Sequence, residues 1–478
     1  MDDLTEGGLT DSGPTDSELA DIGLVGLGVM GANLALNLAE KGFRVAVFDR
    51  DPERRAALAS GAFGARFTAC ENEGALLAAV RPPRPTLLLV PAGAPTDAAI
   101  AGLADLAEPG DLVIDAGNAD FNDTRRRAHE LEARSLTFLG VGVSGGAEGA
   151  RHGPAMMAGG SRAIWARVEP MFTAIAARHG EAPCAAWLGP DGAGHFVKTV
   201  HNGIEYADMQ MIAEVYGLLR DGLGADEARV ADLFRAWSEG PLASYLVEIT
   251  AEVAAAIDPE SGKPVLQIIA DSAGQKGTGR WSAIEALRLG SVASTIEAAV
   301  GARNLSAASE LRASLASPSA AKIDLTPEQL HDALHAGKIV AYAQGFDVLA
   351  RASVEYGWSL DLAQVARVWR AGCIIRSAML DDIAAAFEAH PGASLLSAPA
   401  FRARLDPLLP ALRATVAASA LSGLPAPALA NALAYRDQLT QPRGTANILQ
   451  GLRDYFGQHG FERTDRDGSG FHGPWVSG

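Results

Sequence analysis

Six residues near the start of the chain, Gly26-Leu27-Gly28-Val29-Met30-Gly31, restrict most strongly what this sequence can fold into. They follow a short apolar run, residues 22–25, and precede a stretch with helical spacing that stops at Gly42. Between a strand and a helix, the first glycine permits a tight turn, the second lets the backbone approach a pyrophosphate, and the third lets the helix pack on the strand. A glycine-rich turn without a ligand is the alternative. Asp49, about 20 residues later at the end of the next apolar run, favours the dinucleotide site.

The nature of that dinucleotide depends on Asp49-Arg50-Asp51. A carboxylate at the end of the second strand accepts a hydrogen bond from the 2′-hydroxyl of the adenosine ribose and repels a 2′-phosphate, which favours NAD. An arginine beside it can stack on adenine or hold that phosphate, which favours NADP. The two residues argue in opposite directions, so the choice stays open with a lean towards NAD.

The order of the apolar runs predicts the domains. Strand-like runs alternate with helix-like segments up to about residue 191, which predicts an α/β Rossmann-type domain over 21–191 with a parallel, covered sheet. Ala, Leu, Glu and Arg at helical spacing then predict a large all-α domain over 192–441. Residues 442–478 are polar and Gly-rich and are expected to form an extended tail that docks elsewhere. Residues 1–20 contain six acids and no base, and are expected to be a disordered acidic tail.

Composition excludes several classes of function. The chain has 40 basic and 57 acidic residues, a net charge of −17, which disfavours nucleic acid and anionic membranes as partners. No apolar run reaches the ~18–20 residues that a membrane span needs. Three scattered cysteines fit a reducing compartment, so a cytoplasmic location is expected. Neither they nor the histidines have metal-ligand spacing, and no metal site is predicted.

Two segments carry polar groups where catalysis is plausible. Ser144-Gly145-Gly146 follows a strand-like run and can present a hydroxyl and open N–H groups to a carboxylate, although a structural turn is an equal alternative. On a helix, positions 198, 201, 202, 205 and 206 lie on one face. That face carries Lys198, His201, Asn202, Glu205 and Tyr206. A core-facing stripe would be apolar, so we interpret it as a site in which Lys198 and Glu205 form an acid/base pair, the alternative being a solvated face.

A third segment, residues 271–281, is a Gly-rich loop with two bases and two hydroxyls, among them Lys276 and Thr278. It suits a phosphate monoester, although an exposed lysine in such a loop is common. Arg303 and Arg453 are not distinctive by themselves.

Together these motifs resemble the decarboxylating 6-phosphogluconate dehydrogenases of the long-chain type. The match runs from Asp21 to about Trp475 with its motifs in order. The most specific are residues 142–151, Gly-Val-Ser-Gly-Gly-Ala-Glu-Gly-Ala-Arg; residues 196–206, Phe-Val-Lys-Thr-Val-His-Asn-Gly-Ile-Glu-Tyr; residues 271–281, Asp-Ser-Ala-Gly-Gln-Lys-Gly-Thr-Gly-Arg-Trp; and residues 453–459, Arg-Asp-Tyr-Phe-Gly-Gln-His.

The resemblance implies oxidative decarboxylation of 6-phosphogluconate to ribulose 5-phosphate and CO₂ with hydride transfer to NAD(P), a reaction of the pentose phosphate pathway. It also implies a homodimer whose C-terminal tails are exchanged between subunits. It also implies roles for individual residues. The sugar acid would be held by Ser144, Gly145, Gly146, His201, Asn202 and Glu205, and its phosphate end by Tyr206, Lys276, Thr278 and Arg303 with Arg453 and His459 of the partner subunit. Asn118 would lie between cofactor and substrate.

Two departures lie at the cofactor. This chain has Asp49-Arg50-Asp51 where the family usually has Asn-Arg-Thr or Asn-Arg-Ser, and Val90-Pro91-Ala92 where it usually has Val-Lys-Ala. Both bring the usual NADP preference into question.

The resemblance and the chemistry imply a mechanism. Lys198, kept neutral by neighbouring cations, takes the C3 hydroxyl proton during hydride transfer and returns it during decarboxylation, and Glu205 protonates C1. A related β-hydroxyacid dehydrogenase that does not decarboxylate, and a nucleotide-binding protein without catalysis, are the alternatives.

Overall fold

The computed structural model describes residues 19–316 and 322–475. The predicted disordered tail over residues 1–20 therefore lies outside the described residues, except for its last two. Ala20 is fully buried and forms a parallel bridge with Val80 beside the sheet.

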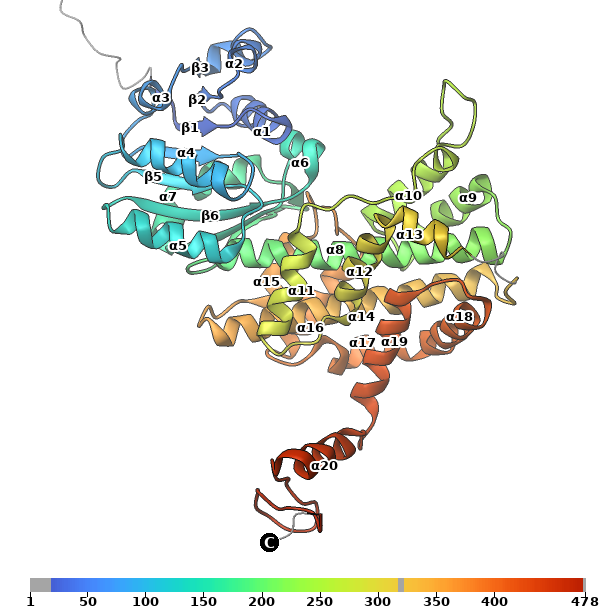
Figure 1. The fold of residues 1–478 in the computed structure, drawn as a ribbon. Coiled ribbons are helices and arrows are strands. Elements are labelled where there is room, and N and C mark those ends of the chain that lie inside the picture. The colour runs from blue at the N-terminus through green and yellow to red at the C-terminus, as the bar shows by residue number, and fades with distance from the viewer. Residues whose placement is uncertain (1–18, 317–321, 476–478) are drawn as a thin grey trace, which may run out of the picture.

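An eight-stranded sheet with helices on both faces forms the first domain (Figure 1). Its spatial order is β10-β7-β6-β5-β4-β1-β2-β3. The strands are β1 (Ile22–Val25), β2 (Val45–Phe48), β3 (Phe67–Ala69), β4 (Pro85–Leu88), β5 (Leu112–Asp115), β6 (Thr137–Val143), β7 (Met156–Gly160) and β10 (Ala185–Gly189). The helices are α1 (Val29–Glu40), α2 (Pro52–Ala59), α3 (Glu73–Ala79), α4 (Ala94–Ala104), α5 (Phe121–Glu132), α6 (Gly146–His152) and α7 (Arg162–Ile175). A separate hairpin pairs β8 (Arg178–His179) with β9 (Ala182–Pro183).

The predicted Rossmann-type domain is confirmed, but its sheet is not parallel throughout. Strands β3-β2-β1-β4-β5-β6 are parallel, whereas β7 runs antiparallel to β6 and β10 runs parallel to β7. The connection between β6 and β7 is short, because its helix α6 has only seven residues. The chain therefore enters β7 at the edge of the sheet where β6 ended and runs in the opposite direction. Apolar side chains cover both faces, since Ile22 and Leu24 of β1 belong to one core and Val25 to the other.

A large helical domain follows and confirms the predicted all-α unit (Figure 1). Its helices are α8 (Ala193–Gly217), α9 (Glu227–Trp237), α10 (Tyr245–Ala255), α11 (Thr278–Arg288), α12 (Ser294–Ser306), α13 (Ser309–Ser314), α14 (Pro327–Glu355), α15 (Leu362–Val368), α16 (Met379–Ala389), α17 (Pro399–Leu405), α18 (Leu409–Ser422) and α19 (Pro427–Thr440). A π-helical turn, Leu218–Gly222, continues α8. Short 3₁₀ turns lie at Gly64–Arg66, Val265–Gln267, Leu395–Ser397 and Asp406–Leu408.

Helices α8 and α14 form the centre of this domain. Helix α14 begins with a capping box in which Thr326 and Gln329 bond each other's backbone N–H groups, with Pro327 in its first turn. A buried ion pair, Lys338 Nζ to Asp208 Oδ2 at 2.8 Å, joins α14 to α8. Because most residues of both helices are buried, hydrophobic packing is the main source of their stability.

The first turns of α8 lie against the sheet and join the two domains. Phe196 of α8, Phe121 of α5 and Trp358 pack their rings edge to face, with centroids 5.0 to 5.9 Å apart. An apolar core that contains residues of both domains therefore lies at their junction, beside the two cores of the sheet, and α8 carries its polar face to the carboxyl end of β6.

Beyond α19, helix α20 (Ala446–Gly457) and the segment that folds back on it project away from the helical domain (Figure 1). Phe461 and Phe471 form an antiparallel bridge in that segment. Residues 446–475 thus have a local structure of their own.

Candidate active site

The glycine loop has the geometry of a pyrophosphate site. Gly26, between β1 and α1, has φ +96°, and a Cβ there would lie 2.6 Å from the carbonyl oxygen of Leu89. A Cβ on Gly31 would collide with the carbonyl of Gly26. Gly28 caps α1 without a side-chain bond and has open space beside it, so the N–H groups of the first turn are available to an anion. These residues fit the pyrophosphate of a dinucleotide.

Asp49 lies at the end of β2 and its carboxylate faces the glycine loop. Oδ2 accepts the N–H of Leu27 at 2.6 Å, and Oδ1 accepts the N–H of Asp51 at 2.9 Å. Asp51 in turn accepts the N–H of Glu53 and caps α2. Arg54 Nη1 lies 3.8 Å from Asp49 Oδ2. The carboxylate is thus partly neutralised by groups of its own chain, and Arg50 next to it is exposed.

The other cofactor residues expected from the sequence lie in two neighbouring loops. Val90, Pro91 and Ala92 follow β4, and Asn118 follows β5, its side chain exposed. Because β4 and β5 are paired and parallel, these loops meet at the same edge of the sheet.

Four side chains predicted to act together do meet at the end of β6. Lys198 Nζ donates to Ser144 Oγ at 2.9 Å and lies 3.3 Å from His201 Nδ1. Ser144 Oγ lies 3.3 Å from His201 Nε2, and Asn202 Oδ1 lies 3.2 Å from His201 Nδ1. Lys198, His201, Asn202 and Ser144 are all buried, so this part of the polar stripe is not a solvated face.

Burial sets the protonation of this cluster. Desolvation lowers the pKa of Lys198, whereas the nearby carboxylate of Glu205 acts against that shift. The expectation that neighbouring cations keep Lys198 neutral is therefore corrected: removal from water has that effect. Desolvation also lowers the pKa of His201 well below its usual range and raises the pKa of Glu205. Both shifts favour the uncharged forms of the amine and of the carboxyl.

The predicted phosphate end lies farther along α8. The guanidinium of Arg303, on α12, lies 3.6 Å from the centre of the Tyr206 ring. Arg303 Nη1 also donates to the carbonyl of Gly274 at 3.4 Å, in the Gly-rich loop. Thr278 is buried at the start of α11, and Lys276 is exposed just before it. The fold therefore joins Arg303 of α12 to Tyr206 of α8, and the start of α11 also lies against Tyr206, since a Cβ on Gly279 would collide with its ring.

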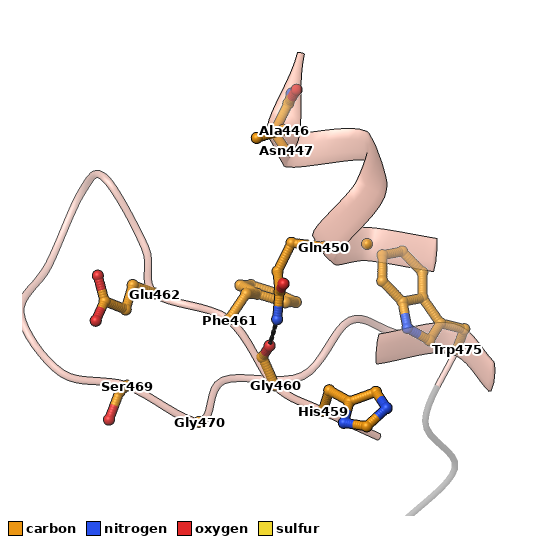
Figure 2. Close-up of a pocket in the computed structure, with 11 residues that line it drawn as sticks. Ala446, Asn447, Gln450, His459, Gly460, Phe461, Glu462, Ser469, Gly470 and Trp475 are labelled. Carbon is orange, nitrogen blue, oxygen red and sulfur yellow. Dashed lines mark hydrogen bonds between the residues drawn. The ribbon is translucent and has the colours of Figure 1, made fainter. Parts of the chain in front are cut away.

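Arg453 and His459 are not brought to this cluster within one chain. Both belong to the projecting segment that contains α20 (Figure 1). His459 lines a pocket of about 640 Å³ between α20 and the segment that folds back on it, where Gln450 Nε2 donates to the carbonyl of Gly460 (Figure 2). The fold-back is held by Asp454, which accepts the N–H groups of Gly460 and Gly473 at 2.9 Å.

Two residues that contact the cluster, Gly142 and Trp369, were not predicted from the sequence. A Cβ on Gly142 would collide with the side chain of Lys198, so only glycine lets α8 lie this close to β6. Trp369 packs its ring edge to face against His201, with centroids 5.6 Å apart. Alternate glycines in an apolar strand, as at 140 and 142, were the available signal for a close backbone approach. Nothing local marks Trp369, which is distant in sequence.

Within residues 19–316 and 322–475, no cluster of three or more His, Cys, Asp or Glu side chains is arranged to hold a metal ion. None of the helices in the described part of the chain combines the length and apolar character that a bilayer crossing requires.

Proteins of one known family match both domains of this chain and the segment that contains α20. Residues 21–189 match the family described as the NAD binding domain of 6-phosphogluconate dehydrogenase, and residues 194–475 match the 6-phosphogluconate dehydrogenase C-terminal domain. The decarboxylating 6-phosphogluconate dehydrogenase of Synechococcus elongatus is 45% identical over 93% of this chain and 97% of its own length. The NAD(+)-dependent decarboxylating enzyme of Bacillus subtilis is 42% identical with the same coverage.

A solved structure agrees with the sequence relatives. The Plasmodium falciparum 6-phosphogluconate dehydrogenase, described in its apo form and in complex with NADP+ and with 6-phosphogluconate, superposes with a TM-score of 0.89. It is 36% identical and covers 95% of this chain and all of its own. With the glycine loop, the Lys198 cluster and these matches in agreement, the chain belongs to the family of decarboxylating 6-phosphogluconate dehydrogenases.

Proposed function

We propose that this enzyme oxidises 6-phosphogluconate with NAD(P) and decarboxylates it to ribulose 5-phosphate and CO₂. The observation that carries the proposal is the buried amine of Lys198, hydrogen-bonded to Ser144 at the point where the dinucleotide domain meets the helical domain. Such a site would offer a base and a general acid on one face of α8, with a phosphate-binding end where α8 meets α11 and α12.

Lys198 is the proposed base. As the neutral amine that burial favours, it takes the proton of the C3 hydroxyl while the C3 hydrogen leaves as hydride. When bound at the glycine loop, a nicotinamide dinucleotide would supply the acceptor for that hydride. Lys198, now charged, donates its proton to the developing enolate oxygen as the C1–C2 bond of the β-keto acid breaks and CO₂ departs.

Glu205 is the proposed acid of the last step. Burial raises its pKa and favours the protonated carboxyl, which gives its proton to the enediol carbon that becomes C1 of the product. The enediol hydroxyl proton returns to the amine of Lys198, which is neutral again after the decarboxylation step, as the ketone forms. Ser144, Gly145, Gly146, His201 and Asn202 would hold the sugar acid, Tyr206, Lys276, Thr278 and Arg303 the phosphate, and Asn118 the junction with the cofactor.

Dual use of NAD and NADP is the proposed cofactor behaviour. Asp49 favours NAD by charge, but its two backbone donors and Arg54 reduce that effect, and exposed Arg50 can meet a 2′-phosphate. The relatives differ in the same respect, since the Bacillus subtilis enzyme is named as NAD(+)-dependent and the Plasmodium falciparum structure is described with NADP+.

We also propose a homodimer in which each tail completes the partner's site with Arg453 and His459. The support is an apolar face on α20 that its own chain leaves exposed, formed by Ile448, Leu449, Leu452, Tyr455 and Phe456. Apolar residues at this spacing on a projecting helix require a partner surface.

The shared site can be tested by mixing two defective chains. One is truncated before Arg443 and the other carries Lys198→Met, so each heterodimer has one complete site and one doubly damaged site. Recovered activity in the mixture is expected if the tail acts in trans. Demonstrated heterodimers without recovered activity would show that the tail serves its own chain.

The reaction itself is tested by mixing the protein with 6-phosphogluconate and either NAD or NADP, following absorbance at 340 nm and released CO₂. Reduced cofactor with equimolar CO₂ is expected. Reduced cofactor without CO₂ would indicate the β-hydroxyacid dehydrogenase alternative, and no reduction with either cofactor would indicate a nucleotide-binding protein without catalysis. The cytoplasmic location stays a prediction.

A further inference from the structure

A buried arginine outside the catalytic cluster joins three segments at the cofactor edge of the sheet. Arg127, on α5, is 1% exposed. Its Nε donates to Asp97 Oδ1 at 2.8 Å, Nη1 to Asp115 Oδ2 at 3.1 Å, and Nη2 to the carbonyl oxygen of Gly93 at 3.2 Å. All three nitrogens of the guanidinium are therefore used, two of them towards the start of α4 and one towards the end of β5.

Each partner belongs to a segment expected to contact the cofactor or to support one that does. Gly93 ends the loop that contains Val90, Pro91 and Ala92, and Asp97 lies in the first turn of α4, directly after it. Asp115 ends β5, and its Oδ1 accepts the N–H of Gly117 at 3.0 Å, which fixes the turn that presents Asn118. Arg127 thus links the loop after β4 to the loop after β5.

The loop after β4 has few polar side chains of its own, and Arg127 adds a side-chain donor to the backbone N–H groups of Thr96 and Asp97 that bond the Gly93 carbonyl. Pro91 has no N–H, and Val90 and Ala92 cannot hydrogen-bond through their side chains. The loop is held through backbone carbonyls instead: Thr96 Oγ1 donates to the carbonyl of Pro91 at 3.0 Å, and Arg127 holds the carbonyl of Gly93.

We propose that Arg127 is a positioning residue for hydride transfer, which holds the Val90–Gly93 loop and Asn118 at the separation that the nicotinamide requires. This inference rests on the proposed function. A planar guanidinium can serve three acceptors in fixed directions, whereas the ammonium of lysine is a compact charge that cannot span them. Hydride transfer is sensitive to such spacing, because small misplacements of reacting groups reduce rates strongly.

The neighbouring arginine provides a matched control. Arg126 also donates to Asp97 Oδ1, at 2.9 Å, but it is exposed, and its other partners are Asp123 and Glu130 on its own helix. Arg126→Lys and Arg127→Lys therefore make the same chemical change one residue apart, and Arg127→Lys alone alters contacts to Gly93 and Asp115.

The experiment compares both variants in the full-length protein with wild type. The measurements are kcat, the KM values of cofactor and 6-phosphogluconate, and the primary isotope effect with 6-phosphogluconate deuterated at C3. For Arg127→Lys, kcat is expected to fall by about ten- to a hundredfold, with an increased isotope effect and a KM for 6-phosphogluconate within about twofold of wild type. Arg126→Lys is expected to match wild type in all of these.

The isotope effect separates positioning from loss of folded protein. If Arg127→Lys only unfolds part of the population, kcat falls while the isotope effect stays at the wild-type value, and that result would overturn the proposal. If kcat, the KM values and the isotope effect of Arg127→Lys equal those of Arg126→Lys, the proposal is overturned as well. If Arg127→Lys does not fold, Asp115→Asn takes its place, since it keeps an acceptor for Gly117 and removes the charge that faces Arg127. The same rise in the isotope effect is then expected, and an unchanged value would contradict the inference. Inactive wild-type protein would instead refute the proposed function.

Discussion

Gly142 on β6 provides the space that the side chain of Lys198 on α8 occupies. A Cβ at position 142 would collide with the Lys198 Cβ and lie 3.0 Å from its Cγ. The strand and the helix therefore meet at a contact that only glycine permits, and this contact delivers the Lys198 amine to Ser144.

Gly142→Ala tests that contact. The added methyl group must displace Lys198, so turnover is expected to fall by at least about tenfold, because misplaced catalytic groups lose rate steeply. Gly217→Ala is the control, since Gly217 ends α8 with no atom near its missing Cβ. Steady-state kinetics with melting curves measure both. Full activity in Gly142→Ala would mean that the backbone adjusts and that the close approach is not required.

Lys198→Met tests the base. Methionine preserves length and helix propensity but removes the amine, so turnover is expected to fall by about two to four orders of magnitude, the usual contribution of a general acid–base group. Cofactor binding, measured by fluorescence titration, should be retained because the glycine loop lies in the other domain. Turnover at a tenth of the wild-type rate would exclude Lys198 as the base.

Asp49→Asn tests cofactor preference. The change removes the charge that opposes a 2′-phosphate and keeps one acceptor for the N–H of Leu27. The ratio of kcat/KM for NADP to that for NAD is expected to rise by about tenfold, the effect of relieving one close like-charge contact. Strict NADP dependence in wild type, unchanged in the variant, would show that Asp49 serves only the glycine loop.

Glu214→Gln tests a buried carboxyl away from the site. Burial raises the pKa of Glu214 to about 7, against the hydrogen bonds from the N–H groups of Ala428 and Leu429. The folded state disfavours the charged form of Glu214. Folding stability is therefore highest below the ordinary pKa of a glutamate and is lost as the pH rises through the raised pKa of about 7. Relative to Glu214→Gln, whose side chain does not ionise, the wild-type melting temperature should therefore decrease as the pH rises from 5 to 8. A constant difference across that range would contradict the raised pKa.

Sequence by itself determined the parts of this protein that depend on short segments. The glycine loop, the helical spacing that places Lys198 and Glu205 on one face, and the boundary between sheet and helices follow from patterns a few residues long. Such patterns suffice because turn geometry and helix periodicity are properties of the local backbone.

Tertiary structure alone decided what those segments meet. Ser144 and Lys198 come together because β6 and α8 pack at Gly142, Asp49 turns towards Leu27, and β7 reverses direction at the edge of the sheet. Arg127 of α5 reaches the start of α4 and the end of β5, which no sequence spacing connects. Contacts of this kind depend on how elements far apart in sequence share a core. Burial in that core then lowers the pKa of Lys198 and raises the pKa of Glu205, and the order of residues does not reveal either shift.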